Sequence, residues 1–187
     1  MSRSFAIGWI VCAAVSSAAL AADVGGIKLD DKTSVGGQEL VLNGAGIRTR
    51  AMFKVYVGSL YLPAKATTVD AALAKGPRRI QLNLLRDLSG DQLSDAVNDG
   101  MKESNAPAVV EAVKGQTDQF IAMLKSAAPF KEGNVITFDF VDGATKIGLN
   151  GSAKGSVPGE AFNRALTRIW IGDTPVQSDL RKAMLGG

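Results

Sequence analysis

The 187-residue sequence contains no histidine and a single cysteine, Cys12, which lies in an N-terminal apolar run. Without these side chains the common zinc sites cannot be assembled. Ser-His-Asp and Cys-His nucleophiles are excluded for the same reason, and the side chain that usually carries protons near neutral pH is missing. Any catalysis would depend on carboxylate, tyrosine, lysine or arginine side chains, or on positioning alone. We expect no metal site and no cofactor.

Long apolar runs are also scarce, and the one at the N-terminus has the pattern of a secretory signal peptide. Arg3 precedes an apolar run over residues 5–15, and small residues follow up to Ala21. The run is shorter than the roughly 20 residues that cross a bilayer, although an uncleaved anchor is the alternative. We therefore expect a signal peptide over residues 1–21, a periplasmic protein without stable membrane insertion, and no cysteine after cleavage.

The rest of the chain is suited to one domain and carries little net charge. Loss of Arg3 would lower the formal net charge from +3 to +2. That balance is too weak to indicate a nucleic-acid partner, for which a dense basic stripe is typical. The length is sufficient for a single domain with a real core. We expect a flexible segment over residues 22–37 and a folded domain over residues 38–187.

Hydrophobic patterns predict an α+β protein. Residues 79–84 alternate between polar and apolar, as in a half-buried strand. Asp142-Gly143 between two alternating segments is a strong hairpin signal, whereas Ser89 to Gln92 form a capping box that starts a helix. The expected strands cover residues 39–43, 50–62, 79–84, 135–141, 145–149 and 152–156. Helices are expected from Ser89, near Pro107 up to Leu124, from Phe162, and after a cap at 174–177. This order of strands and helices is typical of an antiparallel sheet with the helices packed on one side.

One segment combines glycine with several cations. The sequence Gly44-Ala45-Gly46 is interpreted as a turn that places Arg48 at the start of the next strand. On a continuous strand, side chains two residues apart share a face, and that face would hold Arg48, Arg50, Lys54 and Tyr56. Arginine offers a two-pronged donor for a carboxylate, and a tyrosine hydroxyl can complete the contact. The alternative, which the pattern alone favours, is the solvated face of an antiparallel strand.

Four other positions receive structural interpretations. Arg86-Asp87 is expected to be an exposed ion pair at a strand end, rather than part of a cleft mouth. Trp170 lies at helical spacing with other apolar residues and is expected in the core. Tyr61 shares the parity of Val55 and Val57, so it should pack on the face opposite to the cations. Asp139 alternates with apolar residues and is expected to face solvent.

The chain resembles the chalcone isomerase family along nearly its whole length after the leader. Residues 44–48 resemble the Gly-x-Gly-x-Arg of these enzymes, and residues 54–62 resemble the strand that follows it. Residues 89–102 are similar to the family's helix over the ligand cleft. Residues 162–185 are similar to bacterial chalcone-isomerase-like proteins. The resemblance implies an open-faced β-sandwich, in which a curled antiparallel sheet packs on a layer of helices with a ligand cleft between them.

The catalytic residues of the chalcone isomerases are not all present in this sequence. In plant chalcone isomerases an arginine holds the ligand's oxyanion, helped by a threonine, a tyrosine and an asparagine. Arg48 matches the arginine and Tyr56 falls at the threonine position, but Leu93 and Gly100 fall at the tyrosine and asparagine positions. Chalcone cyclisation is therefore not expected. The fatty-acid-binding branch of the fold pairs the arginine with a tyrosine on this strand, an arrangement that Arg48 and Tyr56 match.

Three hypotheses follow from these residues. The first is a non-catalytic protein that binds a small amphipathic anion such as a fatty acid, with Arg48, Tyr56, Lys54 and Arg50 as ligand-binding residues. The second is an isomerase or intramolecular lyase for an unknown enolisable carbonyl compound, with Arg48 stabilising the oxyanion. The third is a scaffold whose cleft is filled by its own side chains.

Overall fold

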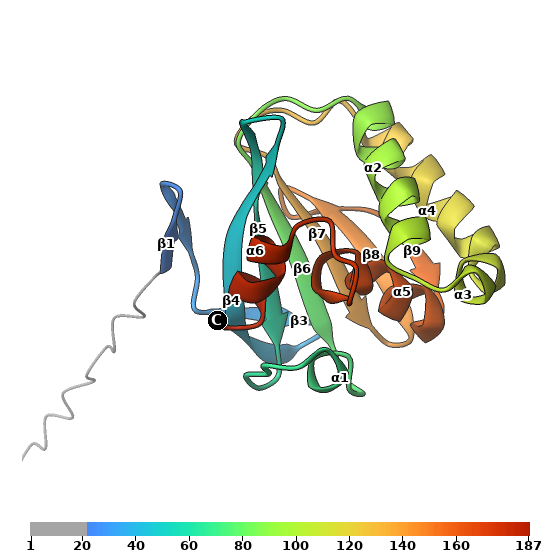
Figure 1. Cartoon of the computed structure of the whole chain (residues 1–187), viewed down its shortest axis with the longest axis horizontal. Coiled ribbons are helices and arrows are strands. Elements are labelled where there is room, and N and C mark those ends of the chain that lie inside the picture. The colour runs from blue at the N-terminus through green and yellow to red at the C-terminus, as the bar shows by residue number, and fades with distance from the viewer. Residues whose placement is uncertain (1–21) are drawn as a thin grey trace, which may run out of the picture.

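The computed structural model describes residues 22–187, so the signal peptide expected over residues 1–21 lies outside the described residues. Seven antiparallel strands form one curled sheet in the order β3-β4-β5-β6-β7-β8-β9 (Figure 1). The strands are β3 Lys32–Val35, β4 Gln38–Arg50, β5 Phe53–Leu62, β6 Arg78–Leu84, β7 Val135–Val141, β8 Ala144–Leu149 and β9 Ser152–Pro158. Each strand pairs with the next strand of the chain, so the sheet is a simple meander.

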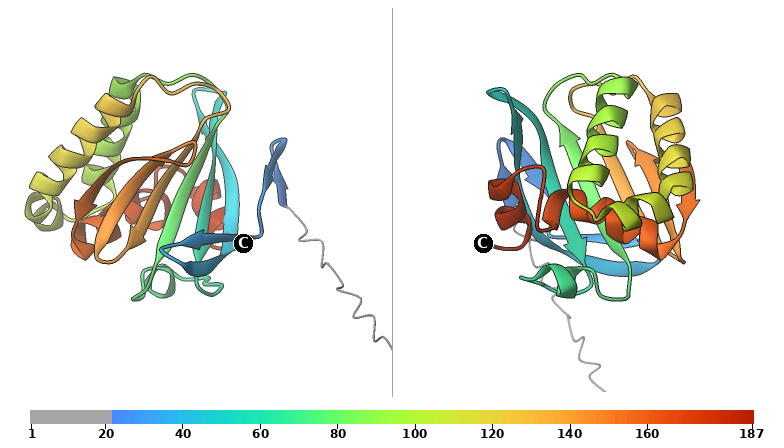
Figure 2. Two further views of the ribbon diagram at one scale, coloured as in Figure 1. Left: turned by 180° about the vertical axis from the view of Figure 1, so that it is seen from behind. Right: turned by 45° about the vertical axis from the view of Figure 1, so that its right-hand side comes forward.

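The helices lie mainly on one side of the curled sheet (Figure 2). They are α1 Val69–Ala72, α2 Gly90–Glu103, α3 Pro107–Ala112, α4 Lys114–Ala127, α5 Glu160–Ile171 and α6 Ser178–Met184. The capping box at Ser89 is confirmed, because the Ser89 hydroxyl accepts from the Gln92 N–H and the Gln92 amide oxygen accepts from the Ser89 N–H. The main core lies between this helix layer and the sheet. The expected fold class, an open-faced β-sandwich, is thus confirmed.

Residues 22–37 form strands, so the expected flexible segment was wrong. β1 Ala22–Val24 and β2 Ile27–Leu29 make a small hairpin, and β3 is hydrogen-bonded to β4. Leu29 and Val35 are only 1% and 2% exposed. They belong to a second apolar cluster together with Val57 and Tyr61, which confirms the separate face expected for Tyr61. Val55 was expected on that face too, but it packs on the main core and lines the cleft. The sequence pattern missed this segment because its strands are only three or four residues long.

The turn before the cation-rich strand lies at a different place from the one expected. β4 and β5 are joined at Ala51 and Met52, whose φ angles are 46° and 68°. Gly44 and Gly46 lie inside β4, where helix α6 packs closely on the strand. A Cβ atom on Gly46 would lie 2.9 Å from the Ala183 Cβ, and one on Gly44 would collide with the Ala183 backbone oxygen. These glycines therefore permit a close helix–strand contact and do not form a turn.

Two helix boundaries also differ from the expected ones. The helix expected from Pro107 to Leu124 is interrupted at Val113, which ends α3 and precedes α4. The final helix begins at Ser178, and no side-chain cap is present at Gln177. Hydrogen bonds made elsewhere by the Gln177 side chain explain this difference, because its amide binds strand β4.

Asp139 was expected to face solvent, but it is partly buried in an ion pair. Its carboxylate accepts from Arg79 Nε at 2.6 Å and from Arg79 Nη2 at 2.7 Å. The two residues are direct partners on β6 and β7. Asp87 likewise pairs with Lys131, at 2.8 Å, and not with Arg86. Both pairings depend on contacts between segments far apart in sequence. Within residues 22–187, no helix is long and apolar enough to span a membrane.

Candidate functional site

A cleft of about 740 Å³ opens between the β4–β5 hairpin and helix α2. Its size falls within the range of about 300–1,000 Å³ that is usual for small-molecule sites. We call it the arginine cleft. Its apolar lining includes Val55, Leu82, Leu88, Val97, Ile169 and Val176, and its charged lining consists of Arg48, Arg50, Arg86, Asp95, Asp99 and Glu103. The presence of an open volume beside Arg48 contradicts the hypothesis of a scaffold whose cleft is filled by its own side chains.

Arg48 is held in place by a glutamine from the other end of the chain. Its Nη1 donates to Gln177 Oε1 at 3.2 Å and to the Thr49 carbonyl at 2.7 Å. Gln177 also accepts from the Thr49 N–H at 2.9 Å and donates to the Ile47 carbonyl at 3.2 Å. Gln177 thereby fastens the strand around the β-bulge that follows Arg48. The Arg48 side chain lines the cleft beside Tyr56, with which it also interacts, so the guanidinium and the phenol can meet a ligand together.

Tyr56 lies directly opposite Arg48 in the β4–β5 ladder. The side chain is 8% exposed, and its hydroxyl oxygen accepts from Trp170 Nε1 at 2.9 Å. Burial raises the pKa of Tyr56, whereas the hydrogen bond to Trp170, the Arg48 charge and a hydrogen bond to Arg48 oppose that shift more weakly. The phenol therefore stays neutral at physiological pH. Because its oxygen is already used as an acceptor by the indole, its own hydrogen can be donated to a ligand oxygen.

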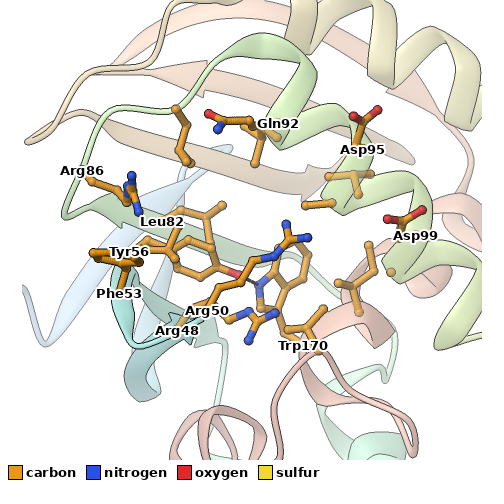
Figure 3. A pocket seen from close by; sticks show the side chains of 18 of the residues that line it. Arg48, Arg50, Phe53, Tyr56, Leu82, Arg86, Gln92, Asp95, Asp99 and Trp170 are labelled. Atoms are coloured by element: carbon orange, nitrogen blue, oxygen red, sulfur yellow. Dashed lines mark hydrogen bonds between the residues drawn. The ribbon is translucent and has the colours of Figure 1, made fainter.

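The charges of the cleft are separated by sign. Figure 3 shows Arg48 and Arg50 extending towards Tyr56 and Trp170, whereas Asp95 and Asp99 project from α2 on the other side of the cleft. The two aspartates and Glu103 follow one another at four-residue intervals and so lie on one face of the helix. An anion would be attracted to the hairpin side and repelled from the helix side. The cleft therefore favours one orientation for an amphipathic anion.

The structure brings together three of the four residues that sequence reasoning grouped into an anion site. Arg48, Arg50 and Tyr56 line the cleft, whereas Lys54 does not. The turn at Ala51-Met52 breaks the continuous strand that the grouping assumed, and the bulge after Arg48 pairs Lys54 with Thr49 instead. Lys54 is exposed on the hairpin. Lys54 therefore does not belong to the cleft.

Three residues of the site were missed or given another role. Trp170 is buried, as expected for a core residue, but it also lines the cleft and donates to Tyr56. Arg86 lies at the cleft mouth, with its guanidinium carbon 5.1 Å from the Phe53 ring centroid. Gln177 is 129 residues from Arg48 in the sequence, and no local pattern marks it. Only the packing of α6 on the hairpin strand brings it to the site.

Leu93 and Gly100 both line the cleft, on helix α2. Neither offers a side-chain hydrogen-bonding group at the positions where plant chalcone isomerases have a phenol and an amide. A Cβ on Gly100 would lie 2.7 Å from Ile169 Cγ2. An asparagine could therefore not replace Gly100 unless the Ile169 side chain shifted. This part of the cleft wall is apolar as a consequence of helix–helix packing.

The curled antiparallel sheet, the helix layer and the arginine cleft together define an α+β protein with an open-faced β-sandwich. The model of the chalcone isomerase-like family matches residues 21–186, so the chain belongs to this family.

Among solved structures, the chain is similar to a fatty-acid-binding protein of Arabidopsis thaliana, with a TM-score of 0.68 and 16% sequence identity. The similarity covers 86% of this chain and 92% of the plant protein. At this level of identity the comparison shows a shared fold. A search among curated proteins found no significant match.

Proposed function

We propose that this protein binds an amphipathic carboxylate, such as a fatty acid, in the arginine cleft and that it does not catalyse a reaction on it. The observation that carries the proposal is the state of Arg48. One of its terminal nitrogens is fixed by Gln177, and its guanidinium lines an open cleft beside the neutral Tyr56 hydroxyl. A carboxylate bound to this guanidinium would form the two-pronged contact that suits arginine.

The neighbouring groups complete a site for one carboxylate head and one apolar tail. Tyr56 supplies a neutral hydroxyl next to the arginine, and Arg50 adds a second positive charge. The apolar wall from Leu82 to Ile169 offers surface for a hydrocarbon chain. The carboxylates of α2 disfavour the reverse orientation, in which the head would lie beside Asp95 or Asp99.

Two further observations support the proposal. The plant protein that shares this fold is a fatty-acid-binding protein. The positions that hold the phenol and the amide in plant chalcone isomerases are occupied here by Leu93 and Gly100, which removes groups that orient a reacting ketone. Export through the leader at residues 1–21 and a periplasmic location belong to the same proposal.

A fatty-acid titration in vesicle-free solution tests the site, with native mass spectrometry to detect ligand that copurifies. Arg48→Gln should weaken binding by about 10- to 100-fold, because hydrogen bonds to a charged group contribute about 1.5–3 kcal/mol. Lys54→Gln is the matched control, since it removes a positive charge from the same hairpin outside the cleft. Its affinity should stay within about twofold of the wild-type value, because exposed charges contribute little.

Equal affinities of the wild type and Arg48→Gln would refute the proposed anchor. The enzymatic hypothesis gives a different result in the same set of proteins. Turnover of an enolisable carbonyl compound by the wild type, lost in Arg48→Gln, would replace the proposal by an isomerase or lyase in which the arginine stabilises an oxyanion.

A further inference from the structure

The tip of the β4–β5 hairpin exposes two adjacent apolar side chains. Met52 is 95% exposed and Phe53 is 61% exposed. Among residues 22–187, Val109 is the only other exposed large apolar side chain, at 40%. The tip projects from one end of the curled sheet, beside the mouth of the arginine cleft (Figures 1 and 3). Apolar side chains gathered at such a projection are typical of a contact surface.

Cations surround these two apolar side chains. Arg50 and Lys54 flank them on the hairpin, and the Arg86 guanidinium lies over the Phe53 ring at 5.1 Å. None of the three cations forms a salt bridge within the described residues. We refer to Met52 and Phe53 with these three cations as the hairpin tip.

The acidic residues that follow Arg86 in the sequence are either paired, as Asp91 is with Lys125 at 2.8 Å, or lie across the cleft. Asp87 is bonded to Lys131 Nζ at 2.8 Å and to the Glu132 N–H at 2.9 Å. Asp95 and Asp99 lie on α2, on the opposite side of the cleft (Figure 3). The hairpin tip therefore presents a positive surface with an apolar centre.

The backbone of the tip indicates that its residues do more than make a turn. Two-residue hairpin turns with positive φ at both positions usually contain Asn-Gly, because those residues adopt this conformation easily. Here Ala51 and Met52 occupy them, at 46° and 68°. Strained residues of this kind are concentrated at functional sites. Met52 is thus held fully exposed in a conformation that does not suit it.

We infer that the hairpin tip docks on a lipid bilayer that contains anionic lipids. Met52 and Phe53 would enter the interface while Arg50, Lys54 and Arg86 contact lipid phosphates, the combination by which interfacial segments bind membranes. A second copy of the chain is a poorer occupant, because a symmetric contact through this surface would bring like charges together. Docking would place the mouth of the arginine cleft against the membrane. If the protein also passes an amphipathic anion between the bilayer and the cleft, that role rests on the proposed function. The docking itself does not.

Co-sedimentation with vesicles tests the docking, using phosphatidylcholine alone and phosphatidylcholine mixed with phosphatidylglycerol. The wild type should bind the mixed vesicles more tightly and lose binding as salt is raised. The decisive variant is Met52→Ser/Lys54→Gln, because neither residue lines the cleft. Partitioning of this variant into the mixed vesicles should fall by about tenfold because the Met52 side chain is lost, and by about fivefold more because the Lys54 charge is lost. Val109→Ser/Lys154→Gln removes an exposed apolar group and an exposed cation elsewhere, and it should bind as the wild type does.

All variants share the same N-terminus, so differences among them report on the hairpin. Equal partitioning of the two double variants would overturn the docking. So would a wild-type protein that binds vesicles with and without phosphatidylglycerol equally, which is the result expected if the tip binds a protein partner. A fatty-acid titration without vesicles separates the two proposals, because Met52→Ser/Lys54→Gln should retain wild-type affinity there. Vesicle binding without fatty-acid binding would leave docking in place and remove the proposed ligand.

Discussion

Close packing of helix α6 on strand β4 makes a stability prediction that also bears on the site. The two glycines of the Gly-x-Gly sequence meet different parts of the same helix residue. A Cβ on Gly46 would meet the Ala183 Cβ at 2.9 Å and the end of the Leu180 side chain at 3.2 Å. A Cβ on Gly44 would meet backbone, namely the Ala183 oxygen and the Met184 oxygen. Backbone atoms cannot rotate away, so the Gly44 position should tolerate alanine less well.

Overpacking of a well-packed core costs about 1–3 kcal/mol. We therefore expect Gly44→Ala to lower the free energy of unfolding by about 3 kcal/mol and Gly46→Ala by about 1 kcal/mol. For a domain of this size the melting temperatures should fall by roughly 6–12 °C and roughly 2–4 °C, respectively. Gly44→Ala should also weaken fatty-acid binding, because α6 begins directly after Gln177, which fastens Arg48.

Thermal and urea unfolding of a double-mutant cycle with Ala183→Gly checks this reasoning. Glycine in the helix costs about 1 kcal/mol by itself, but it removes the Cβ that Gly46→Ala would meet. The cost of Gly46→Ala should therefore be smaller in the Ala183→Gly background, whereas the cost of Gly44→Ala should be unchanged. Gly115→Ala is the control, since its Cβ would have no neighbour within 4 Å, and it should stabilise by about 0.5–1 kcal/mol.

Two results would contradict the packing argument. One is a loss below about 0.5 kcal/mol for Gly44→Ala, the range of ordinary surface substitutions. The other is equal rescue of Gly44→Ala and Gly46→Ala by Ala183→Gly. Either result would mean that the strand glycines do not determine how closely α6 approaches β4.

The two tyrosines of the chain provide the remaining predictions. Tyr56→Phe should destabilise the protein by about 1–3 kcal/mol, because it leaves the buried Trp170 N–H unpaired, and a cycle with Trp170→Phe should show that the two losses are not additive. Burial raises the pKa of Tyr61 to about 12, with Asp30 adding to the shift and Arg79 opposing it. Since an unfolded tyrosine ionises near 10, this contribution to stability is complete below pH 10 and is lost as the pH rises towards 12. Tyr61→Phe should therefore flatten the alkaline fall in unfolding free energy.

Ultraviolet difference spectra and urea titrations at several pH values provide the measurements. The chain has only two tyrosines, so phenolate absorbance reports on both without interference from others. Absorbance that rises fully near pH 10 in the folded protein would contradict the burial of both side chains. Additive losses in the Tyr56 and Trp170 cycle would show that the hydrogen bond between them is not the source of the effect.

Much of the fold could be predicted because its signals are local. The alternation at residues 79–84, the Asp-Gly hairpin turn and the capping box at Ser89 each correspond to an observed strand, turn or helix start. The pattern failed where a residue's role depends on a distant partner. Gly44 and Gly46 resemble a turn in sequence, yet they belong to a strand because α6 lies on them.

The candidate site divides in the same way. The sequence by itself determined that histidine and cysteine chemistry is absent from the described chain, and it predicted a common face for Arg48 and Tyr56, although on one continuous strand and not across a hairpin. The position of the hairpin turn excluded Lys54 from the cleft. Tertiary structure alone decided that Trp170 binds the Tyr56 hydroxyl and that Gln177 holds the arginine. The physical reason is that residue types and spacing act along the chain, whereas the direction of a side chain and its partners depend on packing between segments more than a hundred residues apart.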